Sequence, residues 1–174
     1  EIIGIRNNPT GLVTVDGVAD GYEAFALAAI STELASDRPV IFVARDGQRL
    51  PSIVEALAFA APELPVLEFP AWDCLPYDRV SPGADAAARR LDALAGMIAL
   101  RRAPHRAVIL TTANAILQRI PPAEIIDAQT LRAKPGNQID MKVLIARLET
   151  SGFERVPTVR DVGEFAVRGG ILDL

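Results

Sequence analysis

The residue types that suggest chemistry first appear in segment 17–24, GVADGYEA. A phosphate-binding loop follows the pattern G-x-x-x-x-G-K-[ST], in which backbone N–H groups cradle phosphates, the lysine reaches the outer ones and the hydroxyl binds Mg²⁺. Gly17 begins this frame. Tyr22, Glu23 and Ala24 stand where glycine, lysine and a hydroxyl residue are required. We therefore predict a degenerate, inactive loop that binds neither ATP nor Mg²⁺.

Segment 17–24 has two interpretations that the sequence leaves open. In the first, it is an ordinary strand-to-helix turn in which Asp20 caps the following helix. In the second, it belongs to a nucleotide-dependent enzyme with an unconventional phosphate loop. Glu23 separates the two, because a carboxylate in the place of the lysine repels phosphate. We favour the ordinary turn.

A second cluster of reactive side chains follows a predicted strand and comprises Trp72, Asp73, Cys74, Tyr77 and Asp78. Cys74 has no basic partner nearby in the sequence, and the single histidine, His105, is remote. One cysteine and one histidine do not make a zinc site. We interpret Cys74 as a packed thiol, and Trp72 and Tyr77 as loop anchors. No catalytic residue and no metal site is predicted.

Composition limits the classes of protein to which the chain can belong. Its 174 residues are 50% hydrophobic, enough for a buried core, and its net charge of −4 argues against a general nucleic-acid binder. We expect no membrane span, no signal peptide and no internal disulfide, which is typical of a reducing compartment. Because the chain begins at Glu1 and its last residues resemble a continuing strand, we expect a fragment of a longer protein.

The apolar runs predict the elements that position these side chains. Residues 1–122 alternate strands and helices, the pattern of a parallel α/β domain. The predicted strands are 12–15, 39–44, 66–69 and 107–110, and the predicted helices are 22–34, 48–60, one after Asp85, and 112–118.

The helix after Asp85 carries one apolar stripe, formed by Ala87, Leu91, Leu94 and Ile98. Arg89, Arg90 and Asp92 lie off that stripe. Asp85 itself is a candidate cap for the start of the helix.

A change of pattern after Pro121-Pro122 marks a second domain, residues 123–174. We predict the start of a small, truncated α+β domain. Its expected elements are a helix at 140–150 and strands at 129–133, 153–156, 164–167 and 170–174.

Three segments in the same order resemble the N-terminal region of a known family, the bacterial transcription-repair coupling factor Mfd. They are FPAWDCLPYDRVSP running into GADAAARRLDAL (69–94), TTANAILQRIPP (111–122) and GEFAVRGGILDL (163–174). This region of Mfd is similar to the excision-repair protein UvrB. The resemblance implies a P-loop-like α/β domain followed by a small domain that binds UvrA.

The resemblance also implies properties of the whole protein. Members of the family are ATP-dependent DNA translocases of the bacterial cytoplasm, with ATP and Mg²⁺ in separate motor domains. Other domains contact RNA polymerase and DNA, and the C-terminal domain covers the UvrA-binding surface in the resting state. For this fragment we expect no cofactor, no catalysis and no membrane. The alternatives are a nucleotide-binding enzyme domain of the P-loop type and a DNA-binding module.

Two departures from UvrB bear on function. UvrB has an intact phosphate loop, whereas Tyr22-Glu23-Ala24 abolishes it here. UvrB also inserts a long aromatic hairpin for damaged DNA, and here the connection from Pro82 to Arg89 is too short for one. The sequence therefore resembles UvrB without its ATP site and its DNA probe.

The UvrA-binding surface is expected in the strand near the C-terminus. Alternation along a strand predicts that Phe165 and Val167 face the core and that Glu164, Ala166 and Arg168 share the other face. The resemblance implies that Arg168 contacts UvrA, and a guanidinium suits a partner carboxylate. The alternative is a solvated arginine on a strand face.

Overall fold

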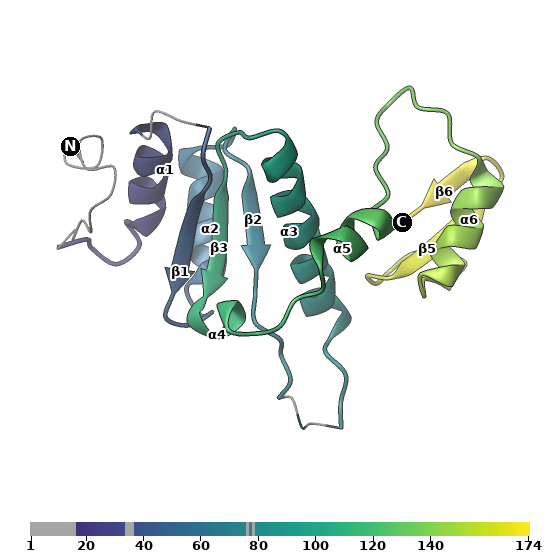
Figure 1. Ribbon diagram of the computed structural model, residues 1–174, viewed down its shortest axis with the longest axis horizontal. Helices are drawn as coiled ribbons and strands as arrows, with labels where there is room; N and C mark the ends of the chain where they lie inside the picture. The colour runs from purple at the N-terminus through teal and green to yellow at the C-terminus, as the bar shows by residue number, and fades with distance from the viewer. Residues whose placement is uncertain (1–16, 34–36, 76, 78) are drawn as a thin grey trace. The chain divides into compact units, whose positions relative to one another are not determined.

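The computed structural model describes residues 17–33, 37–75, 77 and 79–174 (Figure 1). The strand predicted at 12–15 lies outside the described residues. The chain divides after Gln129 into two units, each of which is described by itself.

The first unit contains a parallel three-stranded sheet in the order β1-β3-β2. Its strands are β1 (Val40–Ala44), β2 (Val66–Phe69) and β3 (Val108–Thr112). Every residue of β3 is buried, because this strand is central and has apolar neighbours on both faces. The three strands predicted at 39–44, 66–69 and 107–110 are therefore confirmed.

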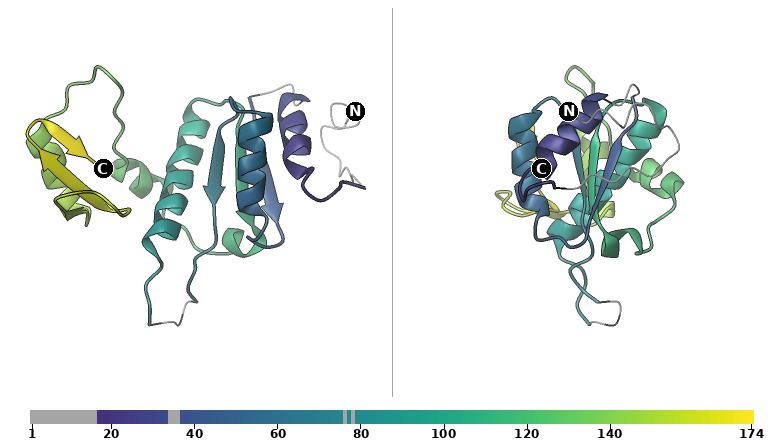
Figure 2. Two further views of the ribbon diagram at one scale, coloured as in Figure 1. Left: turned by 180° about the vertical axis from the view of Figure 1, so that it is seen from behind. Right: turned by 90° about the vertical axis from the view of Figure 1, so that its left-hand side faces the viewer.

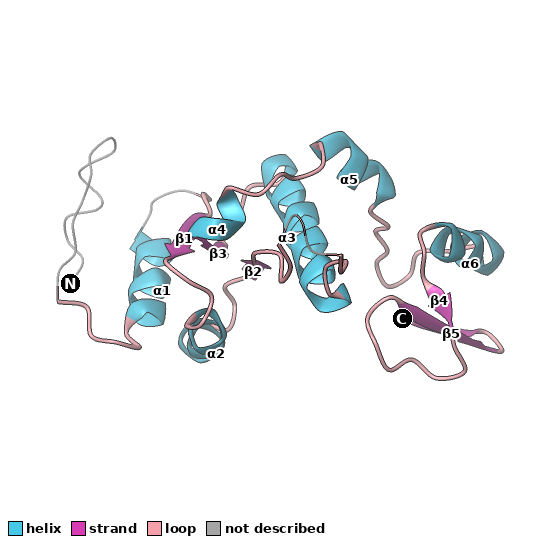
Figure 3. Cartoon of the chain, turned by 90° about the horizontal axis from the view of Figure 1, so that it is seen from below, coloured by secondary structure: helices cyan, strands magenta, loops and turns pink. Residues whose placement is uncertain are grey.

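Helices cover the sheet on both faces (Figure 3). The helices of the first unit are α1 (Glu23–Glu33), α2 (Leu50–Ala60), α3 (Ala84–Arg102), α4 (Ala113–Ile116) and α5 (Ala123–Gln129). Leu27 of α1 and Leu57 of α2 pack with Val108 and Leu110 of β3. Leu100 of α3 packs with Ile109, whose side chain points to the opposite face.

The apolar stripe predicted for α3 is partly wrong. Leu94 is buried, but Leu91 is exposed and Arg90 is among the most buried side chains. The predicted cap is also wrong, because Gly83 precedes the helix without a side-chain cap and Asp85 pairs with Arg89 one turn on. The packed face of the helix is therefore rotated toward Arg90.

The first unit extends beyond the predicted boundary at residue 122. Ile126 of α5 packs in the same apolar cluster as Ala93 and Leu94 of α3. Arg102 at the end of α3 donates to Asp127, with Nη1 2.8 Å from Oδ1. These contacts join α5 to the α/β layer, so that the unit ends at Gln129.

The second unit is a small α+β arrangement. It comprises α6 (Met141–Thr150), β4 (Glu154–Arg155), β5 (Glu164–Arg168) and β6 (Ile171–Asp173), with β5 parallel to β4 and antiparallel to β6. Leu144, Leu148 and Phe165 form its core. The strand predicted at 129–133 is wrong, because α5 continues to Gln129 and residues 130–133 form no strand.

No helix among the described residues is both long and apolar enough to span a bilayer.

Candidate functional site

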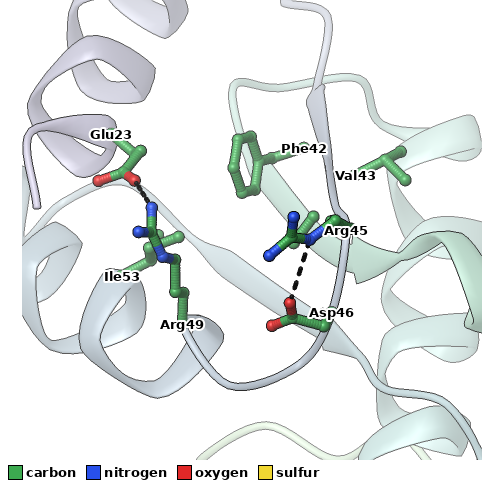
Figure 4. A pocket seen from close by; sticks show the side chains of 8 residues that line it. Glu23, Phe42, Val43, Arg45, Asp46, Arg49 and Ile53 are labelled. Atoms are coloured by element: carbon green, nitrogen blue, oxygen red, sulfur yellow. Dashed lines mark hydrogen bonds and ion pairs between the residues drawn. The ribbon is translucent and has the colours of Figure 1, made fainter. Parts of the chain in front are cut away.

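The turn predicted to resemble a phosphate loop is closed by its own side chains. Glu23 Oε2 accepts a hydrogen bond from the Gly21 N–H at 2.8 Å. Glu23 Oε1 accepts another from Arg49 Nη1 at 2.9 Å (Figure 4). The carboxylate therefore lies at the start of α1, where a phosphate-binding loop would offer its backbone N–H groups to a ligand.

Asp20 does not cap α1 in the way predicted. Its Oδ1 lies 2.9 Å from Arg49 Nη2, so that Arg49 joins two carboxylates of the turn. Tyr22 precedes the helix, and its carbonyl accepts the N–H of Ala26 at 3.1 Å. Ala24 is buried in the core cluster, whereas Tyr22 is exposed and stacks on Phe25.

A cavity of about 390 Å³ opens beside this turn, at the carboxyl end of β1 (Figure 4). Its charged lining residues are Glu23, Arg45, Asp46 and Arg49. Arg49 pairs with Glu23, and Arg45 Nε lies 3.5 Å from Asp46 Oδ2. The positive and negative charges of the lining therefore cancel, which weakens its attraction for an anion.

Asp78 of the reactive-looking cluster lies outside the described residues. The other members lie in the loop between β2 and α3 (Figure 2). Trp72 anchors it, as predicted, because the Arg90 guanidinium lies 4.4 Å from the Trp72 ring centroid and 4.1 Å from that of Phe69. Tyr77 is not an anchor, since its side chain is 97% exposed. Cys74 is half-buried. Among the described residues, no group of three or more His, Cys, Asp or Glu is arranged to hold a metal ion.

Arg90 organises this loop, although the sequence contained no signal for its role. Its Nη1 donates to the Pro70 carbonyl at 2.6 Å and to Gln118 Oε1 at 3.1 Å. Gln118 Oε1 also accepts the Trp72 N–H at 2.9 Å. Burial lowers the pKa of the Arg90 guanidinium from its ordinary value. These contacts assign Trp72 and Arg90 to packing of the loop.

The three candidate side chains of β5 have different environments. Arg168 is exposed, as alternation along the strand predicts, with 65% of its side chain accessible. Glu164 is half-buried, and its Oε2 accepts the N–H groups of Arg160 at 2.7 Å and Asp161 at 3.0 Å. These two hydrogen bonds hold the pKa of the Glu164 carboxyl below its ordinary value. Glu164 therefore fastens the loop before β5.

Ala166 shares the face of Arg168, but the expectation that it is exposed there is wrong. It is only 1% exposed, and it lies on β5, the central strand of its sheet. Phe165 is fully buried and Val167 packs against the same core, as predicted. Of the three candidates, Arg168 alone presents an exposed side chain.

The turn after Arg168 sets its position. Arg168 is paired with Ile171 across the hairpin, so that Gly169 and Gly170 form a two-residue loop. Gly169 has φ +62°, the conformation that a type II′ turn requires at its first central residue. Arg168 Nη2 donates to Asp173 Oδ2 at 2.5 Å on the returning strand.

Comparison with known proteins gives a family match for the second unit and relatives that align with most of the chain. Residues 131–174 match the family model of the UvrB interaction domain. Over 151 residues the chain is 28% identical to the transcription-repair-coupling factor of Escherichia coli (strain K12), covering 86% of this chain and 13% of the relative. The predicted resemblance to the transcription-repair-coupling factors is confirmed.

Two further transcription-repair-coupling factors align with the chain at similar identity and coverage. That of Myxococcus xanthus is 31% identical over 170 residues, which are 93% of this chain and 14% of the relative. That of Mycobacterium bovis (strain ATCC BAA-935 / AF2122/97) is 31% identical over 160 residues, 87% of this chain and 12% of the relative. The chain thus spans about an eighth of the length of these relatives.

The family match covers almost all of the second unit, which begins at Thr130. Arg168, Glu164 and Asp173 therefore lie within the residues that match the model of the UvrB interaction domain. The phosphate-loop turn and segment 70–83 lie outside it. The hairpin of β5 and β6 is accordingly the candidate site.

Proposed function

We propose that this chain is a UvrA-recruiting module of a transcription-repair-coupling factor. The observation that carries the proposal is an exposed arginine, Arg168, on a strand of the UvrB interaction domain. Its guanidinium offers several donors to a carboxylate on the partner. The tight Gly169-Gly170 turn and the buried neighbours Phe165 and Ala166 hold the strand on which it is mounted.

The chain recruits and does not catalyse. At the start of α1 the anion position is taken by Glu23, whose carboxylate accepts the Gly21 N–H. Arg49, the nearest cation, is committed to Glu23 and Asp20. The first unit is on this view a P-loop-like scaffold with a degenerate phosphate loop, which binds neither ATP nor Mg²⁺.

The remaining activities belong to other parts of the whole protein. We assign ATP-dependent DNA translocation, with its ATP and Mg²⁺, to separate motor domains, and contacts with RNA polymerase and DNA to further domains. The C-terminal domain of the same protein covers the UvrA-binding surface in the resting state. The module acts in the bacterial cytoplasm.

Reversal of the charge of Arg168 tests the proposal. We expect R168E to weaken capture by immobilised UvrA roughly 30-fold or more, the effect of losing an interface contact worth about 2 kcal/mol. The free energy of unfolding should change by less than about 1 kcal/mol, because the side chain is exposed. Surface plasmon resonance and thermal unfolding measure the two quantities.

R155E is the matched control for R168E. Arg155 is also exposed and lies on β4, the neighbouring strand of the same unit. It carries the same charge change at a position paired with Phe165, away from the turn that follows Arg168. Equal loss of UvrA binding in both variants would show that the effect comes from net charge alone. Undiminished binding of R168E would show that Arg168 does not contact UvrA.

A further inference from the structure

The outer face of the β5–β6 hairpin places an acid beside the candidate arginine. Residues opposite each other in an antiparallel pair share a face, and the register pairs Ala166 with Asp173 and Arg168 with Ile171. Leu172 and Val167, which lie between them in the register, point to the core. Ala166 shares this face but is buried, and we call the three accessible residues, Arg168, Ile171 and Asp173, the hairpin face.

Arg168 and Asp173 are diagonal neighbours on the hairpin face. Their side chains are 65% and 38% exposed, and Nη2 donates to Oδ2. In the described part of the chain this is the guanidinium's single hydrogen bond. The pair is therefore accessible to solvent and is not embedded in a network.

An exposed pair of this kind affects binding more than folding. A surface ion pair contributes little to stability, because water and salt screen both charges. The effect of the pair on the affinity for a partner is larger. Asp173 cancels the charge of Arg168, and it lies where a carboxylate of the partner would approach. Charge arrangement at the rim of an interface governs association rate and specificity.

We propose that Asp173 is an intramolecular competitor for Arg168. In the free chain it holds the guanidinium, and a carboxylate of the partner takes its place on binding. This inference rests on the proposed function and specifies the partner surface, which carries a carboxylate for Arg168 next to an apolar side chain for Ile171. Ile171 is 63% exposed directly across the strand pair from Arg168.

The test replaces the competing charge by a neutral side chain of the same shape. We expect D173N to tighten UvrA binding about three- to tenfold, mainly through faster association, and to lose much of this gain at high salt. D161N removes the same charge from an exposed position on the loop before β5, away from Arg168, and should leave affinity within about twofold. Biolayer interferometry with purified UvrA measures rates and affinities for the whole chain.

A double-mutant cycle separates competition from a merely structural role. If Asp173 acts through Arg168, D173N should have no effect in an R168Q background. A gain that persists without Arg168, or a D173N variant that binds as weakly as wild type or more weakly, overturns the inference. If the wild-type chain binds UvrA but the cycle gives either of these results, the inference about Asp173 is wrong and the proposed function is unaffected.

The opposite failure is also distinguishable. If neither wild type nor D173N binds UvrA while both show the same cooperative melt, the proposed function falls and the role of Asp173 falls with it. Tighter binding of D173N than of D161N, abolished by R168Q, supports both.

Discussion

At the scale of single residues, Arg90 shows how far tertiary contacts can change the role of a side chain. It lies off the apolar stripe expected for its helix, and it is nevertheless 1% exposed. The rings of Phe69 and Trp72 flank its guanidinium, and Pro70 and Gln118 accept its hydrogen bonds. A cation in this position is stabilised by the ring faces and by charge-assisted hydrogen bonds.

Replacement of Arg90 should therefore destabilise the first unit. We expect R90M to lower the free energy of unfolding by about 2–4 kcal/mol, because the half-buried acceptors Pro70 and Gln118 lose a charged donor and the two rings lose their cation. R90K should recover only part of this loss, since an ammonium lacks the planar donor fork. Denaturant unfolding followed by circular dichroism measures both variants.

Arg89 provides the matched control for Arg90. It is adjacent, half exposed, and paired with Asp85 and Glu68 on the surface. R89M should cost less than about 1 kcal/mol. A loss in R90M no greater than in R89M would contradict the assigned role of Arg90.

At the scale of elements, β5 organises the second unit because it is the central strand between β4 and β6. Its first residue, Glu164, fastens the preceding loop through the N–H groups of Arg160 and Asp161. Its last residue, Arg168, begins the hairpin that carries the candidate site. Simple alternation predicts the direction of each side chain but not what covers it, so Ala166 was wrongly assigned to an exposed face.

The carboxylate of Glu164 should make the second unit sensitive to acid. Its two hydrogen bonds lower the pKa of the folded state, so its contribution to stability is complete above the unfolded pKa of about 4.3. The contribution is lost as pH falls through the lower, folded pKa. We expect E164Q to show a smaller fall in melting temperature than wild type when pH is lowered through this range.

E154Q is the control for the acid titration, because Glu154 is an exposed carboxylate on β4 of the same unit. Thermal unfolding is followed at a series of pH values for the three proteins. Superimposable pH curves for E164Q and wild type would show that the two backbone hydrogen bonds contribute nothing measurable.

At the scale of the whole molecule, the function of each unit is inferred from a different kind of observation. The first has the layered α/β architecture that in other proteins handles nucleotides, with a carboxylate at the start of α1. Residues 131–174 of the second match the family model of the UvrB interaction domain. Fold alone does not determine function, so the docking role that we propose rests on the side chains of the second unit.

The absence of nucleotide handling is testable on the whole chain. We expect no saturable binding of a fluorescent ATP analogue with Mg²⁺ at micromolar concentrations, because Glu23 repels phosphate and engages Arg49. The matched variant Y22G/E23K/A24T restores the phosphate-loop residues. Fluorescence anisotropy compares the two, and micromolar binding by wild type would refute the docking interpretation of the first unit.

Much of this protein followed from its sequence alone. The parallel strands, most helices and the exposure of Arg168 were predictable because they depend on local periodicity and turn residues. The prediction of a degenerate phosphate loop rests on residue types at fixed spacing. The transcription-repair resemblance was visible because three segments occur in the same order.

Tertiary structure decided the burial of Arg90 and Ala166, the extension of the first unit through α5, and the pairing of Arg168 with Asp173. Each depends on which segments meet in space and at what register. Arg90 is buried because two aromatic rings and Gln118 from elsewhere in the chain reach it. No local sequence pattern predicts these contacts, because the interaction energy arises only once segments distant in the sequence have packed together.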